Sequence, residues 1–322
     1  MSRVVGPALI LLCTVIWGSA FIAQKLGADH FGPFAINCFR NLLAGLFLWS
    51  CVRLRERFGK FEQSNIPNIR TILGGALSGL VIFAAMMAQQ LGIERTTPGV
   101  SAFLTANYVL IVPLLAWAVG KGRPGLGVWL GVALALAGTY FLSFSSPSSS
   151  PSDFALGPGE AWTLVCAVLF AVQIMVVDHF APGSDMLRFS MVQMFVAGIV
   201  AFPFVFLPSE LSRLSFSSFV KGVPAILYLG VFSSGIAYTL QNLGQARTPP
   251  ALAAILMSME SVFGAFFGWL LLGDLLSSRQ IWGCAFVLAA VLVSQLFTSL
   301  RTCLSAKIFD ILQAHSSSGS NR

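Results

Sequence analysis

The chain has 322 residues, of which 56% are hydrophobic and only 10% are charged, whereas about a quarter of the residues in an ordinary soluble domain are charged. This much apolar surface cannot be buried in a water-soluble core, and the charges gather in short stretches between apolar runs of about 20 residues, the length that crosses a bilayer. The formal net charge of +7 lies in those stretches rather than on an aromatic-rich soluble face, which argues against nucleic acid as a partner and favours the lipid bilayer.

The apolar runs predict an all-α membrane protein with ten transmembrane helices. Because hydrocarbon offers the backbone no hydrogen-bond partners, and because the runs are too long and too unalternating for barrel strands, each run is expected to be helical. The first run continues through Trp17 and Phe21 without a small-residue cleavage site, so we interpret it as a spanning helix rather than a signal peptide. The expected helices cover residues 6–27, 33–52, 71–92, 98–119, 126–144, 158–180, 187–207, 222–243, 250–272 and 280–298.

Lys and Arg concentrate in two of the connecting loops. The loop after the second helix carries five of them between Arg53 and Arg70, and the loop after the fourth helix carries Lys121 and Arg123. By the positive-inside rule these loops are cytoplasmic, and ten helices then place both termini on the cytoplasmic side. The predicted location is the bacterial inner (plasma) membrane, with multiple crossings.

An internal repeat is the most informative pattern in the chain. Shifting the sequence by 152 positions places residues 89–92 (QQLG) on 241–244 (QNLG), and residues 95–98 (RTTP) on 247–250 (RTPP). The register then persists without a gap. A unit of five helices crosses the membrane an odd number of times, so its second copy is inverted, which is typical of transporters that open one site to either side in turn.

The repeat also predicts how the chain is divided. Residues 1–144 hold the first repeat with helices 1–5, and residues 158–298 hold the second repeat with helices 6–10. The Ser/Pro-rich residues 145–157 are expected to form an extracytoplasmic linker, and residues 299–322 a disordered cytoplasmic tail.

Three stretches carry a family resemblance: residues 16–21 (IWGSAF), 39–44 (FRNLLA), and 259–264 (MESVFG) with the helix end LGD at 272–274. They resemble the drug/metabolite transporter superfamily, specifically its EamA-type members with two EamA repeats. Ser261 replaces the usual Pro of the family pattern and Asp274 the usual Glu, so the ninth helix is expected to be straighter. The resemblance covers residues 6–298. It implies two inverted five-helix repeats and the transport of amino acids, purines, drugs or other small metabolites.

Glu260 is the leading candidate for a substrate or proton site. An ionisable side chain in the middle of a spanning helix costs several kcal/mol unless it faces a cavity or a partner. A buried carboxyl group there can carry a proton or bind a cationic substrate group. The alternative is a carboxylate held by a neighbouring hydroxyl or amide for packing alone.

Two amide pairs stand at repeat-related positions. Gln241 and Asn242 lie one turn beyond Tyr238 in the eighth helix, and their mates in the third helix are Gln89 and Gln90. Two such pairs on opposing walls would offer neutral donors and acceptors to a zwitterionic or polar metabolite. The alternative is interhelical hydrogen bonding, worth about 0.6 kcal/mol on average.

Further candidates come from the fourth, sixth and seventh helices. The repeat aligns Tyr108 with Glu260, which favours a site wall at that depth, and Asn107 lies beside Tyr108. Gln173 and Gln193 are weaker candidates by the same cavity argument.

Three other features are explained by simpler structural roles as well as, or instead of, a functional role. Trp17 is a candidate cavity-lining residue, with packing or interfacial anchoring as the alternative. Arg40 is expected near the outer end of the second helix, with its side chain snorkelling to the headgroups. Glycine pairs four residues apart, such as Gly75 and Gly79, favour close helix approach within the chain over dimerisation.

Catalytic motifs are missing from the sequence: it has no P-loop, no HExxH and no paired-aspartate protease pattern. The six cysteines also lack the spacing of metal ligands. We therefore expect no enzymatic activity, no cofactor and no metal. The preferred hypothesis is a secondary transporter that exports small polar metabolites, amino acids or related compounds, by alternating access and with optional proton coupling. A non-transporting receptor or scaffold, and an uncoupled facilitator or channel, stay open as alternatives. The substrate, the direction, the coupling ion and the oligomeric state are also open, and a monomer is compatible with the sequence.

Overall fold

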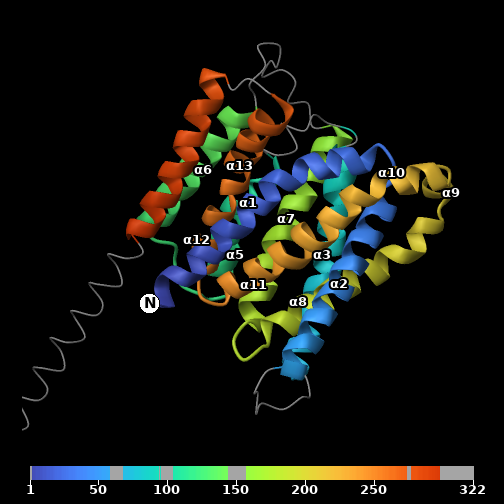
Figure 1. Cartoon of the computed structure of the whole chain (residues 1–322). Helices are drawn as coiled ribbons and strands as arrows, with labels where there is room; N and C mark the ends of the chain where they lie inside the picture. The colour runs from blue at the N-terminus through green and yellow to red at the C-terminus, as the bar shows by residue number, and fades with distance from the viewer. Residues whose placement is uncertain are drawn as a thin grey trace, which may run out of the picture.

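The computed structural model describes residues 2–58, 68–93, 95, 104–143, 157–273 and 277–297, and all regular structure in those ranges is helical (Figure 1). The prediction of an all-α protein is therefore confirmed for this part of the chain. Residues 145–156 of the expected linker and the expected tail at 299–322 lie outside the described residues, as does Asp274.

The first half of the chain contributes helices whose starts and ends follow the apolar runs. Pro33 begins one of them, as suits a residue whose missing N–H would have no intrahelical partner there. The bounds are α1 Ser2–Ala28, α2 Pro33–Phe58, α3 Ile69–Ile93, α5 Tyr108–Ala118 and α6 Leu126–Ser143.

The second half contains more irregular helices. Gly183 lies in the turn after the Pro158–Phe180 helix and Gly273 directly follows the Gly268–Leu272 helix, both with positive φ, which glycine adopts without steric cost. The bounds are α7 Pro158–Phe180, α8 Met186–Ala201, η2 Phe202–Phe206, α9 Pro208–Leu211, α10 Phe216–Leu227, η3 Tyr228–Ala237, α11 Tyr238–Gln245, α12 Pro250–Met257, α13 Met259–Phe267, η4 Gly268–Leu272 and the helix Ser278–Phe297.

Eight helical segments in the described ranges are long and apolar enough to cross a membrane: Val4–Ala28, Pro33–Phe58, Ile69–Gly92, Pro158–Phe180, Met186–Phe206, Phe216–Gln245, Pro250–Leu271 and Ser278–Phe297. Two further apolar helices, Tyr108–Ala118 and Leu126–Leu142, are shorter. The sequence therefore predicted a multi-pass membrane protein correctly, and eight of the ten expected spans reach the length of a full crossing.

The helix contacts occur in pairs, as a duplicated unit predicts. In the first half, α1 packs on α11 and α13. In the second half, its repeat counterpart α7 packs on α3 and α5. The counterparts α2 and α8 pack on each other. Figure 1 shows α1 rising from the end marked N, whereas α7 descends toward that end. The second set of contacts is thus an inverted copy of the first.

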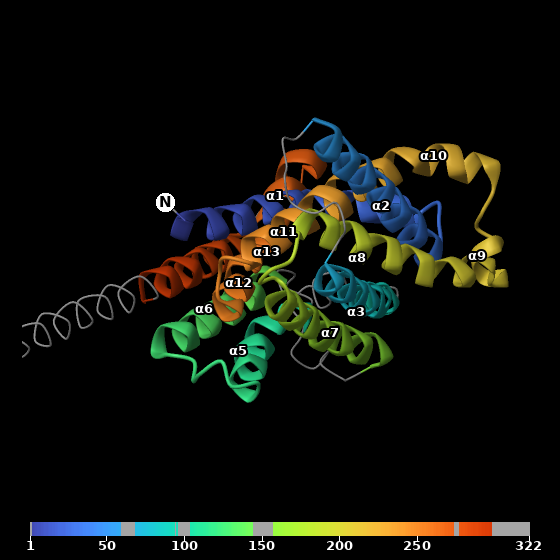
Figure 2. The ribbon, with the colours of Figure 1, turned by 90° about the horizontal axis from the view of Figure 1, so that it is seen from below.

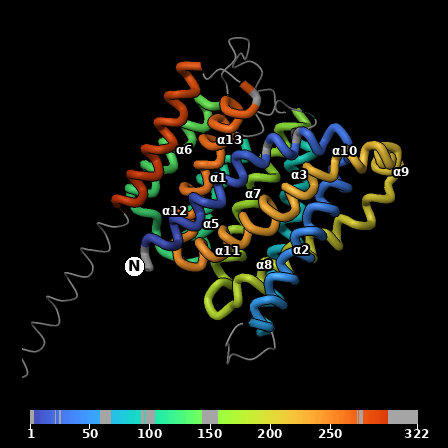
Figure 3. The backbone as a smooth tube through the Cα atoms, viewed as in Figure 1, coloured from blue at the N-terminus to red at the C-terminus, as the bar shows by residue number. Residues whose placement is uncertain are grey.

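The two halves interlock rather than lying side by side. Seen from below in Figure 2, α1, α11 and α13 pass through the middle of the bundle, while α9 and α10 lie at the far end from α6. The tube in Figure 3 shows the Ser278–Phe297 helix beside α6. Gly127 and Gly131 of α6 allow this approach, because an added Cβ would meet Phe297 and Ser294.

A glycine seam brings α3 close to α8. A Cβ added at Gly75 would lie 2.7 Å from the Phe189 carbonyl oxygen, and one added at Gly79 would lie 2.6 Å from the Gln193 carbonyl oxygen. These distances leave no room for a side chain, so both glycines serve packing within the chain, as their spacing predicted.

Helix interruptions occur at repeat-related positions. Ser258 separates α12 from α13, and its hydroxyl donates to the Ile255 carbonyl at 2.7 Å. Its repeat mate Ala106 stands in the turn before α5, where the Asn107 amide donates to the Leu104 carbonyl at 3.0 Å. Back-bonding of this kind bends helices. The straighter ninth helix expected from Ser261 stays a prediction, because Pro250–Leu271 forms one spanning segment and its interruption lies at Ser258, three residues before Ser261.

Candidate functional site

A cavity lies between the two halves of the chain, and both halves supply its walls. Together with its open mouth it holds about 650 Å³ of empty space. Its first-half lining is Trp17, Gln24, Arg40, Met86, Gln89, Thr105 and Tyr108, and its second-half lining is Phe170, Gln173, Ile174, Ser233, Tyr238, Gln241, Met257 and Glu260.

Seven of the eleven residues proposed from the sequence line this cavity: Trp17, Gln89, Tyr108, Gln173, Tyr238, Gln241 and Glu260. The other four do not line it. Asn242 and Gln193 are buried behind the wall, and Gln90 and Asn107 are partly buried beside it.

Glu260 lies in the first turn of α13, directly after the interruption at Ser258. Within the described residues its carboxyl group makes no hydrogen bond and no ion pair. Its repeat mate Tyr108, the first residue of α5, lines the same cavity. The two halves thus place a carboxylate and a phenol at equivalent positions, and the carboxylate is free to contact a bound molecule.

Arg40 does not snorkel to the membrane surface, contrary to the sequence-based expectation. The side chain is 5% exposed and lines the cavity. Its Nε donates to Ser234 Oγ at 2.9 Å and its Nη2 donates to Ser233 Oγ at 3.1 Å. The physical reason is a pair of hydroxyl acceptors from the second half, which the sequence of α2 cannot reveal.

The hydroxyls that hold Arg40 lie in the π-helix η3, between α10 and α11. π-Helical turns are rare and occur frequently at functional sites. The Trp17 indole nitrogen donates to the Ser233 carbonyl at 3.2 Å, and the Trp17 ring meets the Tyr238 ring edge-on at 4.9 Å. Trp17 therefore has both proposed roles, since it packs and also lines the cavity.

A cluster of buried amides lies at α11, and two of its members, Gln173 and Gln241, line the cavity. Gln241 Nε2 donates to Gln173 Oε1 at 3.2 Å and to Gln245 Oε1 at 3.1 Å. Asn242 Nδ2 donates to Gln193 Oε1 at 2.7 Å. We call these five residues the amide cluster. They link α7, α8 and α11. Asn242 and Gln193 therefore make an interhelical hydrogen bond, as in the alternative interpretation of the amide pairs.

The repeat mates of Gln241 and Asn242 differ from the amide cluster in exposure and hydrogen bonding. Gln89 and Gln90 are partly exposed near the end of α3, and neither makes a hydrogen bond within the described residues. Figure 1 shows that α3 ends at the opposite end of the bundle from α11. We call the two ends of the cavity the Gln241 end and the Gln89 end.

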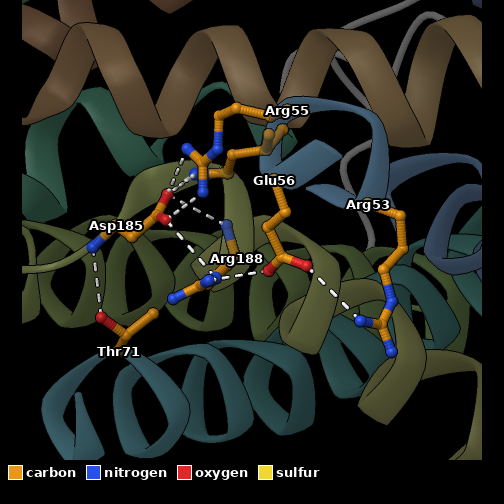
Figure 4. Close-up of polar contacts among 7 residues, drawn as sticks. Arg53, Arg55, Glu56, Thr71, Asp185 and Arg188 are labelled. Carbon is orange, nitrogen blue, oxygen red and sulfur yellow. Dashed lines mark hydrogen bonds and ion pairs between the residues drawn. The ribbon is translucent and has the colours of Figure 1, made fainter. Parts of the chain in front are cut away.

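An ion-pair network lies beyond the Gln241 end, where α2 finishes and α8 begins (Figure 4). Both nitrogens of the Arg55 fork bind the Asp185 carboxylate, and Arg188 Nη2 lies 2.7 Å from Glu56 Oε1. Asp185 also caps α8, because its Oδ1 accepts from the Leu187 N–H at 3.1 Å.

The charge state of Asp185 follows from this environment. Partial burial acts to raise the pKa of the carboxyl, but the hydrogen bonds and charges of Arg55 and Arg188 outweigh burial and hold the pKa below its ordinary value. The carboxylate therefore stays ionised and fixes α2 to the start of α8.

Sequence reasoning missed Gln24, Arg40, Met86, Phe170, Ile174, Ser233 and Met257 as lining residues. For Arg40 a signal existed, because a charged residue seven positions inside an apolar helix points to a cavity more often than to lipid. No comparable signal marked Ser233, since its role depends on η3. In the part of the chain that the structure describes, no three His, Cys, Asp or Glu side chains gather closely enough to hold a metal ion.

Comparison with known proteins gives a consistent result. The model of the EamA-like transporter family matches residues 4–144 and 157–296. An uncharacterized transporter of Archaeoglobus fulgidus is 27% identical, over 92% of this chain and 87% of its own length. The uncharacterized inner membrane transporter YedA of Escherichia coli is 23% identical, over 87% of each chain. A chloroplastic WAT1-related protein of Arabidopsis thaliana is 27% identical over 85% of this chain and 66% of its own length.

A solved crystal structure matches the fold with a TM-score of 0.74 over 92% of this chain and 98% of its own chain, at 16% identity. At that identity the match concerns the fold alone.

Proposed function

Because this chain belongs to the EamA-like transporter family, we propose that it is a secondary transporter that moves a small polar metabolite by alternating access. The observation that carries the proposal is the cavity between the two halves, with Glu260 in its wall and without a protein partner in the described residues. Substrate sites of inverted-repeat carriers lie between the repeats, next to interrupted helices. The cavity meets both conditions.

The interruptions at Ser258 and Ala106 support the mechanism. Each lies two residues before a cavity-lining residue, Glu260 in one half and Tyr108 in the other. An interruption at a repeat-related position in each half would let the two halves exchange conformations, so that the site opens to one side and then to the other.

The difference between the two ends supports a one-sided opening in this structure. At the Gln241 end the amide cluster is buried and hydrogen-bonded between helices, whereas Gln89 and Gln90 at the other end are partly exposed and unbonded within the described residues. Alternating access requires that at least one end is closed in every state, because a cavity that was open at both ends would be a channel.

The proposed orientation places the Gln241 end toward the cytoplasm of a bacterial inner membrane. Arg53, Arg55 and Arg57 end α2 beyond that end, and Arg188 lies beside them. Basic residues accumulate on the cytoplasmic side. The start of α1 and the end of the Ser278–Phe297 helix lie at the same end of the bundle in Figure 1, so both termini are proposed to be cytoplasmic.

The substrates we propose are amino acids or related compounds, moved in the export direction with Glu260 as the proton-coupling group. The test is flux of a mixture of labelled amino acids into proteoliposomes, with and without a pH gradient. Saturable flux that responds to the gradient is expected. Flux that never saturates would indicate a channel, and the absence of flux for any metabolite would contradict a carrier.

Glu260→Gln tests the role of the carboxylate. Removing one charge from a desolvated contact costs 2–5 kcal/mol, so flux is expected to fall at least about thirtyfold and to lose its pH response. The matched control is Asp29→Asn, since Asp29 is an exposed carboxylate outside the cavity. Wild-type flux with unchanged pH dependence in Glu260→Gln would contradict the coupling role.

A further inference from the structure

Arg40 carries a buried positive charge that the chain does not neutralise. Its two hydrogen bonds go to the hydroxyls of Ser233 and Ser234, which are neutral acceptors. Within the described residues Arg40 forms no ion pair, and its Nη1 has no hydrogen-bond partner. A charge in this environment is costly, so it is retained where it binds something that enters the cavity.

The surroundings of Arg40 are arranged to present its guanidinium rather than to neutralise it. The Ser234 hydroxyl donates its proton to Asn41 Oδ1 at 3.2 Å, which leaves its lone pairs for Arg40 Nε. The Trp17 indole donates to the Ser233 backbone carbonyl and fixes α1 against η3. The Nε and Nη2 edge of the guanidinium is thereby anchored, while Nη1 remains to meet a ligand.

Glu260 supplies the opposite charge in the same cavity. It too lacks a partner among the described residues, and it does not pair with Arg40, because no nitrogen of Arg40 comes within 4.0 Å of its carboxylate. Both charges are therefore available to one bound molecule. A purely anionic ligand would leave Glu260 unpaired, and a purely cationic ligand would leave Arg40 unpaired.

We propose that the cavity binds a small zwitterion, with the substrate carboxylate on Arg40 and its ammonium group at Glu260. This proposal rests on the proposed function and deepens it, because it names the anion-binding residue and the charge pattern of the substrate. Met86, Phe170, Ile174 and Met257 contribute apolar wall to the same cavity. An amino acid with an apolar side chain has all three features.

The experiment measures equilibrium binding to the purified full-length protein with matched probes. L-leucine, 4-methylpentanoate and 3-methylbutylamine share a hydrocarbon body, and the second and third lack the ammonium and the carboxylate respectively. L-phenylalanine, 3-phenylpropanoate and phenethylamine form a second set. At least one amino acid is expected to bind at least tenfold more tightly than its acid and its amine. Equal affinities within both sets, or no binding by any probe, would overturn the proposal.

Variants then assign the two ends of the probe. Arg40→Gln is expected to weaken amino-acid binding at least tenfold while leaving amine binding unchanged. Glu260→Gln is expected to weaken amino-acid binding at least tenfold while leaving acid binding unchanged. Arg213→Gln serves as the control, because Arg213 is exposed in the turn between α9 and α10. Equal losses for acid and amine in either variant would contradict the assignment.

Two further measurements keep the outcome decisive. If Arg40→Gln does not give monodisperse protein, Arg40→Lys retains the charge and is expected to bind the amino acid more weakly than wild type but still in preference to the amine. Flux in proteoliposomes separates the two proposals: saturable flux of a metabolite without preference for zwitterions contradicts this inference and the amino-acid substrates but leaves the carrier function standing, whereas absence of any flux contradicts the transport function.

Discussion

The two ends of the cavity are built from repeat-related residues, yet their polar groups differ in state. At the Gln241 end, Gln241 and Asn242 are 2% and 0% exposed and hydrogen-bonded to other helices. At the Gln89 end, the mates Gln89 and Gln90 are partly exposed and unbonded within the described residues. The two repeat-related amide pairs thus differ in exposure and hydrogen bonding within a single structure.

The comparison teaches that repeat-related amides can be hydrogen-bonded between helices at one end and unbonded at the other within the described residues. Each interhelical hydrogen bond contributes little, about 0.6 kcal/mol on average in a membrane, so bonds of this kind are weak enough to form and break during a transport cycle. The Asp185 network beyond the amide cluster is stronger and joins α2 to α8, which pack on each other along the bundle. The amides are therefore the better candidates for the part that moves.

The most direct way to break the comparison is to label the two mates with a cysteine reagent. In Gln89→Cys the thiol is expected to react with a membrane-impermeant maleimide at least about tenfold faster than in Gln241→Cys, because Gln89 is partly exposed whereas Gln241 is buried. The measurement is the labelling rate in intact cells or oriented vesicles, corrected for the wild-type background. Equal rates would show that the ends do not differ.

A smaller effect is expected at the ion-pair network. Asp185→Ala removes a helix cap worth about 1 kcal/mol and a partly exposed ion pair worth at most about 1 kcal/mol. The midpoint of thermal unfolding at neutral pH is expected to fall by about 4 °C. Asp178→Asn is the control, since Asp178 pairs with Lys121 but caps no helix. An unchanged midpoint in Asp185→Ala would mean that α2 and α8 are held by packing alone.

The pH dependence of this effect has a definite sign. The pKa of Asp185 is depressed in the folded state, so its contribution is fully present above the unfolded value of about 3.9 and is lost as the pH falls toward the folded pKa. The difference between wild type and Asp185→Asn, which keeps a capping oxygen, is expected to shrink as the pH falls through the unfolded value of about 3.9 toward the lower folded pKa. A difference that grows on acidification would contradict this sign.

The smallest effect on stability is expected at the amide cluster itself. Asn242→Leu removes the hydrogen bonds to Ser190 and Gln193, at 2.9 and 2.7 Å, and is expected to lower the unfolding midpoint by about 2 °C. The repeat-related control Gln90→Leu removes an amide without hydrogen bonds in the described residues and is expected to cause no decrease. The same decrease in both variants would show that the amide cluster adds no stability of its own.

Several parts of the site were within reach of sequence reasoning. Glu260 stood out because a carboxylate in an apolar run needs a reason to be there, and the 152-residue shift led from Glu260 to Tyr108 and from Gln241 to Gln89. All four line the cavity. Arg40 was misplaced, because its position along α2 does not say which neighbours the helix faces.

The sequence by itself determined the helices and their duplication, because hydropathy and a repeated register are properties of the chain alone. Only the tertiary structure decided which polar residues meet. Ser233 and Ser234 reach Arg40 across 193 and 194 positions of sequence, and they do so through a π-helix that no residue type announces. It also decided which amide pair is hydrogen-bonded, since repeat-related amide side chains can be bonded or unbonded according to how the two halves are packed.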